Sequence, residues 1–188
     1  MRASAIIRHM LDFSRSGGSK RVPCDVTSIL DKAVALAGSD YDLKKSYDFR
    51  RITITRDYEA GLPLVDCSPT ELEQVLLNLL RNAAHALAES HRDGEGPAIH
   101  LRVRRQDETV VIDVQDNGPG IPVALQRRIF EPFYTTKPPG VGTGLGLSVS
   151  YFIVTKGHGG NLTVVTPPEG GTLFRIELPL QGSTEAHS

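Results

Sequence analysis

The order of the alternating segments most constrains the fold of this chain. Two pairs of segments alternate between apolar and polar residues as half-buried strands do, 99–105 with 109–115 and 161–166 with 171–178, and a further strand is expected over 51–58. The members of each pair follow one another directly, as antiparallel strands joined by a short turn do. A doubly wound sheet instead needs a helix between successive strands. The sequence therefore predicts an α+β sandwich with a mixed, mostly antiparallel sheet.

Helical periodicity places long helices between these strands. Apolar residues recur at three- and four-residue steps over 26–37 and 69–90, and a third helix is expected to end near Lys156. Asp25 and Ser68 stand directly before the first two helices and are suitable N-caps. We therefore expect two layers, with three helices packed on one face of the sheet.

The composition excludes several classes of function. The chain carries 21 basic and 22 acidic residues, and its net charge of -1 argues against nucleic acid as a partner. No apolar run approaches the ~20 residues that cross a bilayer, so no membrane contact is expected from this chain. Cys24 and Cys67 have no metal-binding spacing and are expected to stay reduced, as in a cytoplasmic protein.

The helix over 69–90 carries an unusual polar stripe. At about 100° per residue, five polar side chains between apolar neighbours fall within an arc of roughly 80°: Glu71, Gln74, Asn78, Asn82 and His85. One interpretation is a solvated polar face. Asparagine is a poor helix former, however, and solvated faces more often use Glu, Lys or Arg. The other interpretation is that the amide oxygens of Asn78 and Asn82 face Mg²⁺ and phosphates.

A turn of small residues, Asp116 to Gly120, follows directly after the strand over 109–115. Its sequence, Asp-Asn-Gly-Pro-Gly, is typical of a tight turn. The same residues fit a base-binding site, because glycine lets a flat base approach the backbone and Asp116 can accept a hydrogen bond from an exocyclic amine. Such a contact favours adenine over guanine, which presents a carbonyl oxygen instead.

Glycine is concentrated in the segment before the third helix. Four glycines stand at every second position between Gly140 and Gly146, and Lys137 lies just before them. Backbone N–H groups of such a loop, with the start of a helix behind them, can hold phosphate. The segment is no P-loop, since no Lys follows a GxxxxG, and no dinucleotide fingerprint, since no apolar strand precedes it. A flexible interdomain linker is the alternative.

Taken in order, these segments resemble the sequence boxes of the ATP-binding catalytic domain of two-component sensor histidine kinases, in the GHKL superfamily. The resemblance covers about residues 23–181. Its parts are an N box (EQVLLNLLRNAAHA, Glu73 to Ala86), a first glycine box (DNGPGIP, Asp116 to Pro122), an F box (FEPFYTTK, Phe130 to Lys137), a second glycine box (GTGLGLS, Gly142 to Ser148) and a closing box (GGTLFRIELP, Gly170 to Pro179). The resemblance implies a Bergerat-type fold, ATP and Mg²⁺ as ligands, and protein-histidine kinase activity.

The resemblance also implies roles for individual residues. Asn78 and Asn82 would hold Mg²⁺ and the phosphates, Asp116 would bind the adenine amine, and Thr172 would assist through a water. The other nucleotide-binding residues that it implies are His85, Gly118, Gly120, Lys137, Thr143, Gly144, Leu145, Gly146 and Leu147. By the same comparison, His158 is interpreted as structural.

The resemblance divides the chain into three parts. Residues 1–18 resemble the end of a dimerisation hairpin with its linker, 19–181 form the catalytic domain, and 182–188 are expected to be a disordered tail. In these kinases an acidic residue follows the acceptor histidine, and it follows none of the six histidines here. We therefore expect a part of a kinase that lacks the acceptor and its adjacent base, so no catalytic residue is assigned and autophosphorylation is not expected from this chain alone.

The implied partners are a histidine-bearing dimerisation domain, a response regulator and a second copy of the chain through its N-terminal helix. Membrane anchoring of a longer parent chain stays open. Two other functions also stay open. ATP hydrolases of the same superfamily place a water-activating Glu where this chain has Asn78, and an amide cannot take that proton. The second is a regulatory module that binds nucleotide without transferring a phosphoryl group.

Overall fold

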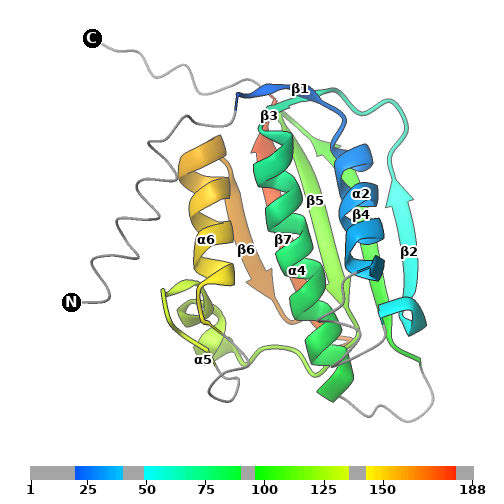
Figure 1. Cartoon of the computed structure of the whole chain (residues 1–188), viewed down its shortest axis with the longest axis vertical. Helices are drawn as coiled ribbons and strands as arrows, with labels where there is room; N and C mark the ends of the chain where they lie inside the picture. The colour runs from blue at the N-terminus through cyan, green and yellow to red at the C-terminus, as the bar shows by residue number, and fades with distance from the viewer. Residues whose placement is uncertain (1–19, 40–48, 90–95, 136–142, 181–188) are drawn as a thin grey trace.

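A computed structural model describes residues 20–39, 49–89, 96–135 and 143–180 (Figure 1). These ranges do not include residues 1–18, which resemble the end of a dimerisation hairpin, nor Lys137, nor the expected tail at 182–188. Within the described part of the chain, no helix is both long enough and apolar enough to cross a membrane.

The main sheet has five strands in the order β2-β4-β5-β7-β6. Their bounds are Thr53–Tyr58 for β2, Ala98–Gln106 for β4, Thr109–Asp116 for β5, Asn161–Val165 for β6 and Thr172–Pro179 for β7. Only β2 and β4 run parallel, and the three other pairs are antiparallel. The expectation of a mixed, mostly antiparallel sheet is confirmed. The strand expected from residue 51 begins at Thr53, after a single 3₁₀ turn at Phe49–Arg51.

Three helices cover one face of this sheet (Figure 1): α2 (Val26–Ser39), α4 (Pro69–Glu89) and α6 (Gly146–Phe152). The two-layer α+β arrangement is therefore confirmed. A fourth, short helix, α5 (Val123–Gln126), follows the turn after β5 and leads into a 3₁₀ turn at Arg128–Phe130. The third helix is shorter than expected as an α-helix, because it changes at Ile153–Gly157 into a π-helical turn.

The two expected N-caps are present. The Asp25 carboxylate accepts the backbone N–H of Thr27 at 2.9 Å, and hydrogen bonds from the hydroxyls of Thr27 at 2.6 Å and Ser28 at 2.7 Å lower the pKa of the Asp25 carboxyl. The Ser68 hydroxyl accepts the backbone N–H of Glu71 at 3.2 Å. Side-chain oxygens thus satisfy N–H groups that have no partner within the helix, and each helix starts at a defined residue.

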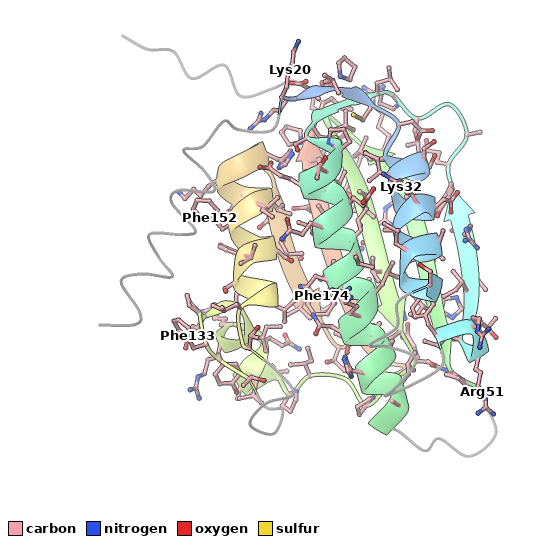
Figure 2. All side chains as sticks on the ribbon, in the orientation of Figure 1. Lys20, Lys32, Arg51, Phe133, Phe152 and Phe174 are labelled. Atoms are coloured by element: carbon pink, nitrogen blue, oxygen red, sulfur yellow. The ribbon has the colours of Figure 1, made fainter. Side chains whose placement is uncertain are left out.

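A continuous apolar core lies between the helices and the sheet, with buried side chains from α2, α4, β4, β5 and β7. Charged side chains such as Lys20 and Arg51 project from the edges of the molecule (Figure 2). Lys32 of α2 forms an ion pair with Glu73 of α4 at 2.6 Å, on the outer side of the helical layer. Helix α4 lies between α2 and α6 on this face of the sheet (Figure 1).

His158 connects two helices from a buried position. Its Nε2 accepts the backbone N–H of Ser68 at 3.0 Å, and its Nδ1 lies 2.9 Å from the carbonyl oxygen of Ile153. With both ring nitrogens used inside the core, His158 has the structural role expected for it.

A second, two-stranded sheet was not expected. Strands β1 (Val22–Cys24) and β3 (Val65–Cys67) pair antiparallel beside the N-terminus of α4, and Arg21 donates a hydrogen bond to the carbonyl oxygen of Gly157. Each strand has three residues, which is too short for an alternating pattern to be recognised. Cys24 and Cys67 are free thiols, as expected.

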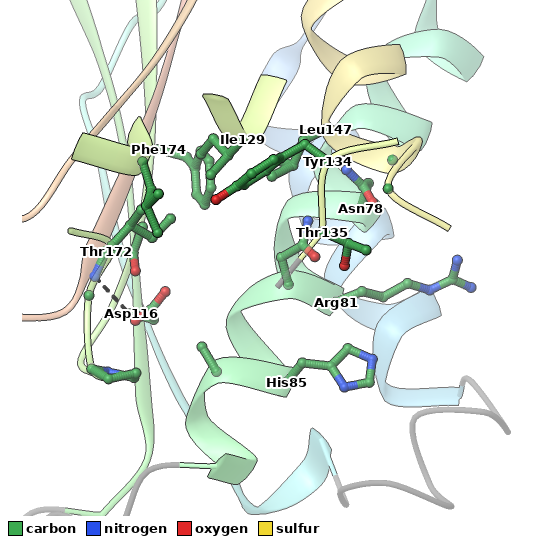
Figure 3. A pocket seen from close by; sticks show the side chains of 18 of the residues that line it. Asn78, Arg81, His85, Asp116, Ile129, Tyr134, Thr135, Leu147, Thr172 and Phe174 are labelled. Carbon is green, nitrogen blue, oxygen red and sulfur yellow. Dashed lines mark hydrogen bonds between the residues drawn. The ribbon is translucent and has the colours of Figure 1, made fainter. Parts of the chain in front are cut away.

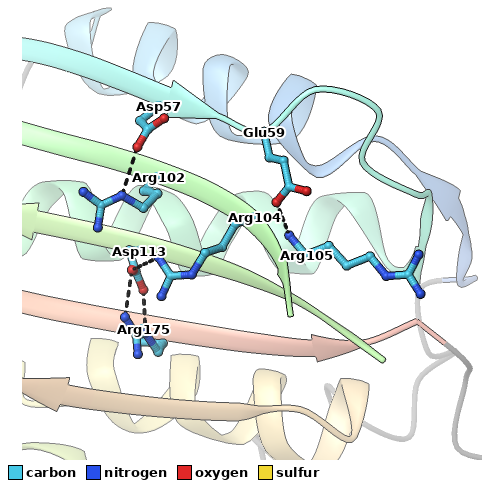
Figure 4. A network of polar contacts seen from close by, with 7 residues as sticks. All are labelled: Asp57, Glu59, Arg102, Arg104, Arg105, Asp113 and Arg175. Carbon is cyan, nitrogen blue, oxygen red and sulfur yellow. Dashed lines mark hydrogen bonds and ion pairs between the residues drawn. The ribbon is translucent and has the colours of Figure 1, made fainter. Parts of the chain in front are cut away.

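The face of the main sheet away from the helices is held by ion pairs (Figure 4). Asp113 of β5 is 2 % exposed, because Arg175 binds it through Nε and Nη2 at 2.8 and 2.9 Å and Arg104 through Nη1 at 3.1 Å. Arg102 and Asp57 form a similar pair at the sheet's edge. The alkyl parts of these arginines cover the strands, so this face needs no further layer.

Candidate functional site

A cavity of about 430 Å³ opens between α4, the end of β5 and the segment that enters α6 (Figure 3). Most of the nucleotide-binding residues expected from the sequence line it: Asn78, Asn82, His85, Asp116, Gly120, Thr143, Gly144, Gly146, Leu147 and Thr172. Gly118 and Leu145 stand next to the cavity wall without being part of it. Segments that are far apart in the sequence therefore meet around one space.

Asp116 is held in place by the backbone around it. It is the last residue of β5 and is 2 % exposed, and its Oδ1 accepts the N–H of Gly118 at 2.8 Å and the N–H of Thr172 at 3.2 Å. Thr172 lies directly opposite it on β7. Two N–H donors stabilise a carboxylate and fix its rotamer. The glycine turn thus orients a carboxylate at the cavity wall (Figure 3).

The approach of β7 to Asp116 depends on Gly171. This residue has φ +83°, and a Cβ at this position would lie 1.9 Å from the carbonyl oxygen of Asp116. No side chain fits at that distance. Glycine at 171 is therefore required for Thr172 to reach Asp116.

The polar stripe of α4 divides into two parts. Asn78, Asn82 and His85 line the cavity, whereas Gln74 is exposed and the carboxylate of Glu71 lies 4.0 Å from Nε2 of buried His158. The C-terminal part of the stripe is half-buried in the cavity wall instead of lying on the open surface. The five residues of the expected stripe extend too far along the helix axis to contact one ligand, since residues 71 and 85 are about 21 Å apart along a helix.

Two segments meet at the entrance to α6. The N–H of Phe133 donates to the carbonyl oxygen of Gly144 at 2.9 Å, and both residues have positive φ, +68° and +65°. A Cβ on Gly144 would lie 2.5 Å from the Phe133 carbonyl carbon. This contact joins the residues on both sides of 136–142, and Tyr134, Thr135 and Thr143 all line the cavity.

Sequence reasoning missed several wall residues. The apolar ones are Ala86, Pro119, Ile121, Pro122, Leu125, Ile129, Tyr134 and Phe174. Arg81 is the only Lys or Arg, and Asp116 the only carboxylate, in the described part of the wall. Figure 3 shows these two charged residues on opposite sides. The one signal for Arg81 in the sequence is its position three residues from Asn78 on the same helix.

The chemistry of the site is thus divided along its length. The Asp116 carboxylate stands at one side with Phe174, suited to a flat base with a hydrogen-bond donor, and Asn78 stands at the other with the Arg81 guanidinium, suited to an anionic group (Figure 3). The described residues include no group of three His, Cys, Asp or Glu side chains that could hold a metal alone. The amides of Asn78 and Asn82 fit a cation that takes most of its ligands from phosphate and water.

Comparison with known families identifies the class of this domain. The family described as histidine kinase-, DNA gyrase B-, and HSP90-like ATPase matches residues 67–182, which include every described residue of the cavity wall. The chain belongs to this ATPase family.

Its relatives are sensor kinases. The two-component sensor PprA of Pseudomonas aeruginosa is 37 % identical over 194 aligned positions, which cover 99 % of this chain and 19 % of that protein. The sensory histidine kinase/phosphatase NtrB of Rhizobium meliloti is 33 % identical, over 95 % of this chain and 46 % of its own length. The chain thus spans less than half of each of these relatives.

Solved structures of histidine kinases have the same fold. The catalytic domain of histidine kinase ThkA superposes with a TM-score of 0.70 at 28 % identity, covering 86 % of this chain and 98 % of that one. Full-length ShkA in complex with AMPPNP gives a TM-score of 0.68 at 25 % identity, covering 87 % of this chain and 32 % of that one.

Proposed function

We propose that this chain binds ATP with Mg²⁺ in the cavity between α4, β5 and α6 and serves as the catalytic domain of a sensor histidine kinase. The observation that carries the proposal is the fixed Asp116 carboxylate on the opposite side of the cavity from Arg81 and Asn78. A nucleotide has the same polarity, with a donor on its base at one end and phosphates at the other.

Adenine is the base that fits Asp116. Its exocyclic amine donates a hydrogen bond, and the carboxylate accepts it. Guanine would bring a carbonyl oxygen to the same place, and two acceptors would repel each other. The purine ring would pack among Ile121, Leu147 and Phe174, where the burial of apolar surface adds to affinity.

The phosphates would lie toward Asn78 and Asn82. Mg²⁺ prefers hard oxygen ligands and keeps phosphate and water around it, so one or two amide oxygens are enough on the protein side. Arg81 and His85 lie on the same part of α4 and would neutralise phosphate charge, and Lys137 is proposed to do so from outside the described residues. Bound Mg²⁺ would draw charge from the terminal phosphate.

The proposed reaction is phosphoryl transfer from ATP to a histidine on a dimerisation domain. The bond between the γ-phosphorus and the oxygen that bridges to the β-phosphate breaks, a P–N bond forms on the imidazole, and ADP leaves. The cavity contributes orientation and charge neutralisation, and a base beside the acceptor takes the imidazole proton. A response-regulator aspartate then receives the group, and residues 1–18 are proposed to join the dimerisation hairpin.

The relatives support this proposal because they are sensor kinases, and ShkA was solved with AMPPNP, an ATP analogue. Hydrolysis in place of transfer is disfavoured by Asn78, since its amide cannot take a proton from water. His85 lines the cavity. In this proposal it contacts the nucleotide and is not the histidine that receives the phosphoryl group.

The test combines binding with transfer. Calorimetric titration of the chain with ADP, GDP and adenosine in Mg²⁺ should give the tightest binding for ADP. The chain is then mixed with ATP labelled at the γ-phosphate and a separate dimerisation hairpin that carries an acceptor histidine. Label on the hairpin supports the kinase. Nucleotide binding without label on any hairpin from the kinase relatives would favour a regulatory module, and rapid phosphate release without it would favour a hydrolase.

A further inference from the structure

Ser150 is a buried polar residue with a partner on another helix. It lies in α6, is 2 % exposed, and does not belong to the cavity wall. Its hydroxyl oxygen accepts a hydrogen bond from Nδ2 of Asn78 on α4 at 3.0 Å. This bond links the helix that carries the amides to the helix that begins at the second glycine box.

The two ends of the Asn78 amide lie in different surroundings. The nitrogen faces Ser150. The oxygen lies at the start of α6, since a Cβ on Gly146 would be 2.4 Å from Oδ1 but 3.2 Å from Nδ2. Asn78 and Gly146 both line the cavity. The bond to Ser150 therefore leaves the oxygen end beside the space that the ligand would occupy.

We infer that Ser150 is a positioning residue that presents the amide oxygen of Asn78 to the cation of a metal–nucleotide complex. This inference rests on the proposed function. A cation binds the oxygen of a carboxamide, and the NH₂ group of the same amide must then find an acceptor within the protein. Ser150 supplies that acceptor, so the orientation that suits the cation leaves no polar group unsatisfied.

Removal of the hydroxyl should act on the metal-dependent part of binding. In Ser150→Ala, the NH₂ group has no partner whenever the oxygen faces the cation, so the affinity for ADP with Mg²⁺ should fall about tenfold. Adenosine, and ADP in EDTA, do not engage the cation, and their affinities should change by less than about twofold.

Ser148 provides a matched control in the same helix. It is 6 % exposed, and its hydroxyl donates to the carbonyl oxygen of Leu145 in its own chain segment at 2.9 Å. Ser148→Ala removes the same group from a similarly buried position without touching Asn78. It should leave the ratio of the ADP affinities with and without Mg²⁺ unchanged.

The measurement is calorimetric titration of the whole chain with ADP in Mg²⁺, ADP in EDTA and adenosine. A double variant of Asn78→Ala and Ser150→Ala should bind Mg²⁺–ADP no more weakly than Asn78→Ala alone. Equal losses for all three ligands in Ser150→Ala would overturn the inference and indicate general packing. The inference would also be overturned if the ratio of the ADP affinities with and without Mg²⁺ were the same in Ser150→Ala as in the unmodified chain.

The unmodified chain gives a second readout, which holds even if the variant does not fold. The side-chain NH₂ signal of Asn78 can be identified by NMR from its loss in Asn78→Ala. Slow exchange of its protons with water supports the bond to Ser150, and rapid exchange overturns it. If ADP binds the unmodified chain equally with and without Mg²⁺, the proposed metal site itself is wrong, which separates that failure from a failure of Ser150 alone.

Discussion

The substitution Asp116→Asn separates base recognition from folding. Oδ1 of Asp116 accepts the N–H groups of Gly118 and Thr172, at 2.8 and 3.2 Å. The oxygen of an asparagine amide can accept the same two bonds, so the turn and the β5–β7 pairing should persist. The NH₂ group then takes the place of the second carboxylate oxygen, and it would meet the adenine amine as a second donor.

The expected loss follows from the hydrogen bond that disappears. A hydrogen bond to a charged group contributes about 1.5–3 kcal/mol, which corresponds to about ten- to hundred-fold in affinity. Asp116 is almost fully buried, so solvent does little to weaken this contact. ADP should therefore bind at least about tenfold more weakly to the variant. GDP should lose less affinity than ADP, because the carbonyl oxygen of guanine can accept a hydrogen bond from the new NH₂ group.

Calorimetric titration with ADP and GDP measures both effects, and thermal unfolding checks that the variant is folded. Asp66→Asn is a control, since Asp66 lies on β3 and is not part of the cavity wall. An unchanged dissociation constant for ADP in a folded Asp116→Asn protein would refute the reasoning. Asp116 would then serve only the turn.

Three further predictions concern the metal, the backbone and the core. Asn82→Ala should weaken the binding of ATP with Mg²⁺ much more than the binding of adenosine in the same titration, because the Asn82 amide oxygen serves the metal and phosphates. Equal losses of affinity for the two ligands would point to damage of α4. Gly171→Ala should lower the free energy of unfolding by about 3 kcal/mol or more in urea titrations, since its Cβ would lie 1.9 Å from the carbonyl oxygen of Asp116. Burial raises the pKa of the Cys67 thiol to about 12 from 9.0. An unfolded chain thus loses this proton near pH 9 while the folded one keeps it, so the free energy of unfolding should fall from about pH 9 to pH 12, by up to about 1.4 kcal/mol per pH unit. Cys67→Ala should show a shallower fall.

Strands β4, β6 and β7 could be predicted because every second residue of each strand faces the core. Residues of β4 alternate between buried and exposed from Ile99 to Val103, and the expected bounds differ from the observed ones by one residue. Strands β1 and β3 have no such pattern. Their pairing depends on the position of α4 and on long-range contacts such as that of Arg21 with Gly157, which local periodicity does not contain.

The types of residue that line the cavity could be predicted from the sequence. How far the cavity extends along α4 could not. Helical angles placed Asn78, Asn82 and His85 on one face, but angles carry no information about depth along the axis. They therefore also included Glu71, whose neighbour is His158. Arg81 was missed because a lone arginine on a helix is ordinarily a solvated residue. The structure shows that it is part of the cavity wall.

The glycines of this site have a second use that sequence reasoning did not give them. They were expected to supply N–H groups to phosphates and room for a base. The structure shows that two of them also let another backbone approach a functional side chain: Gly171 brings β7 to Asp116, and Gly146 brings α6 to Asn78. A side chain at either position would displace the carboxylate or the amide, even where no ligand touches the glycine.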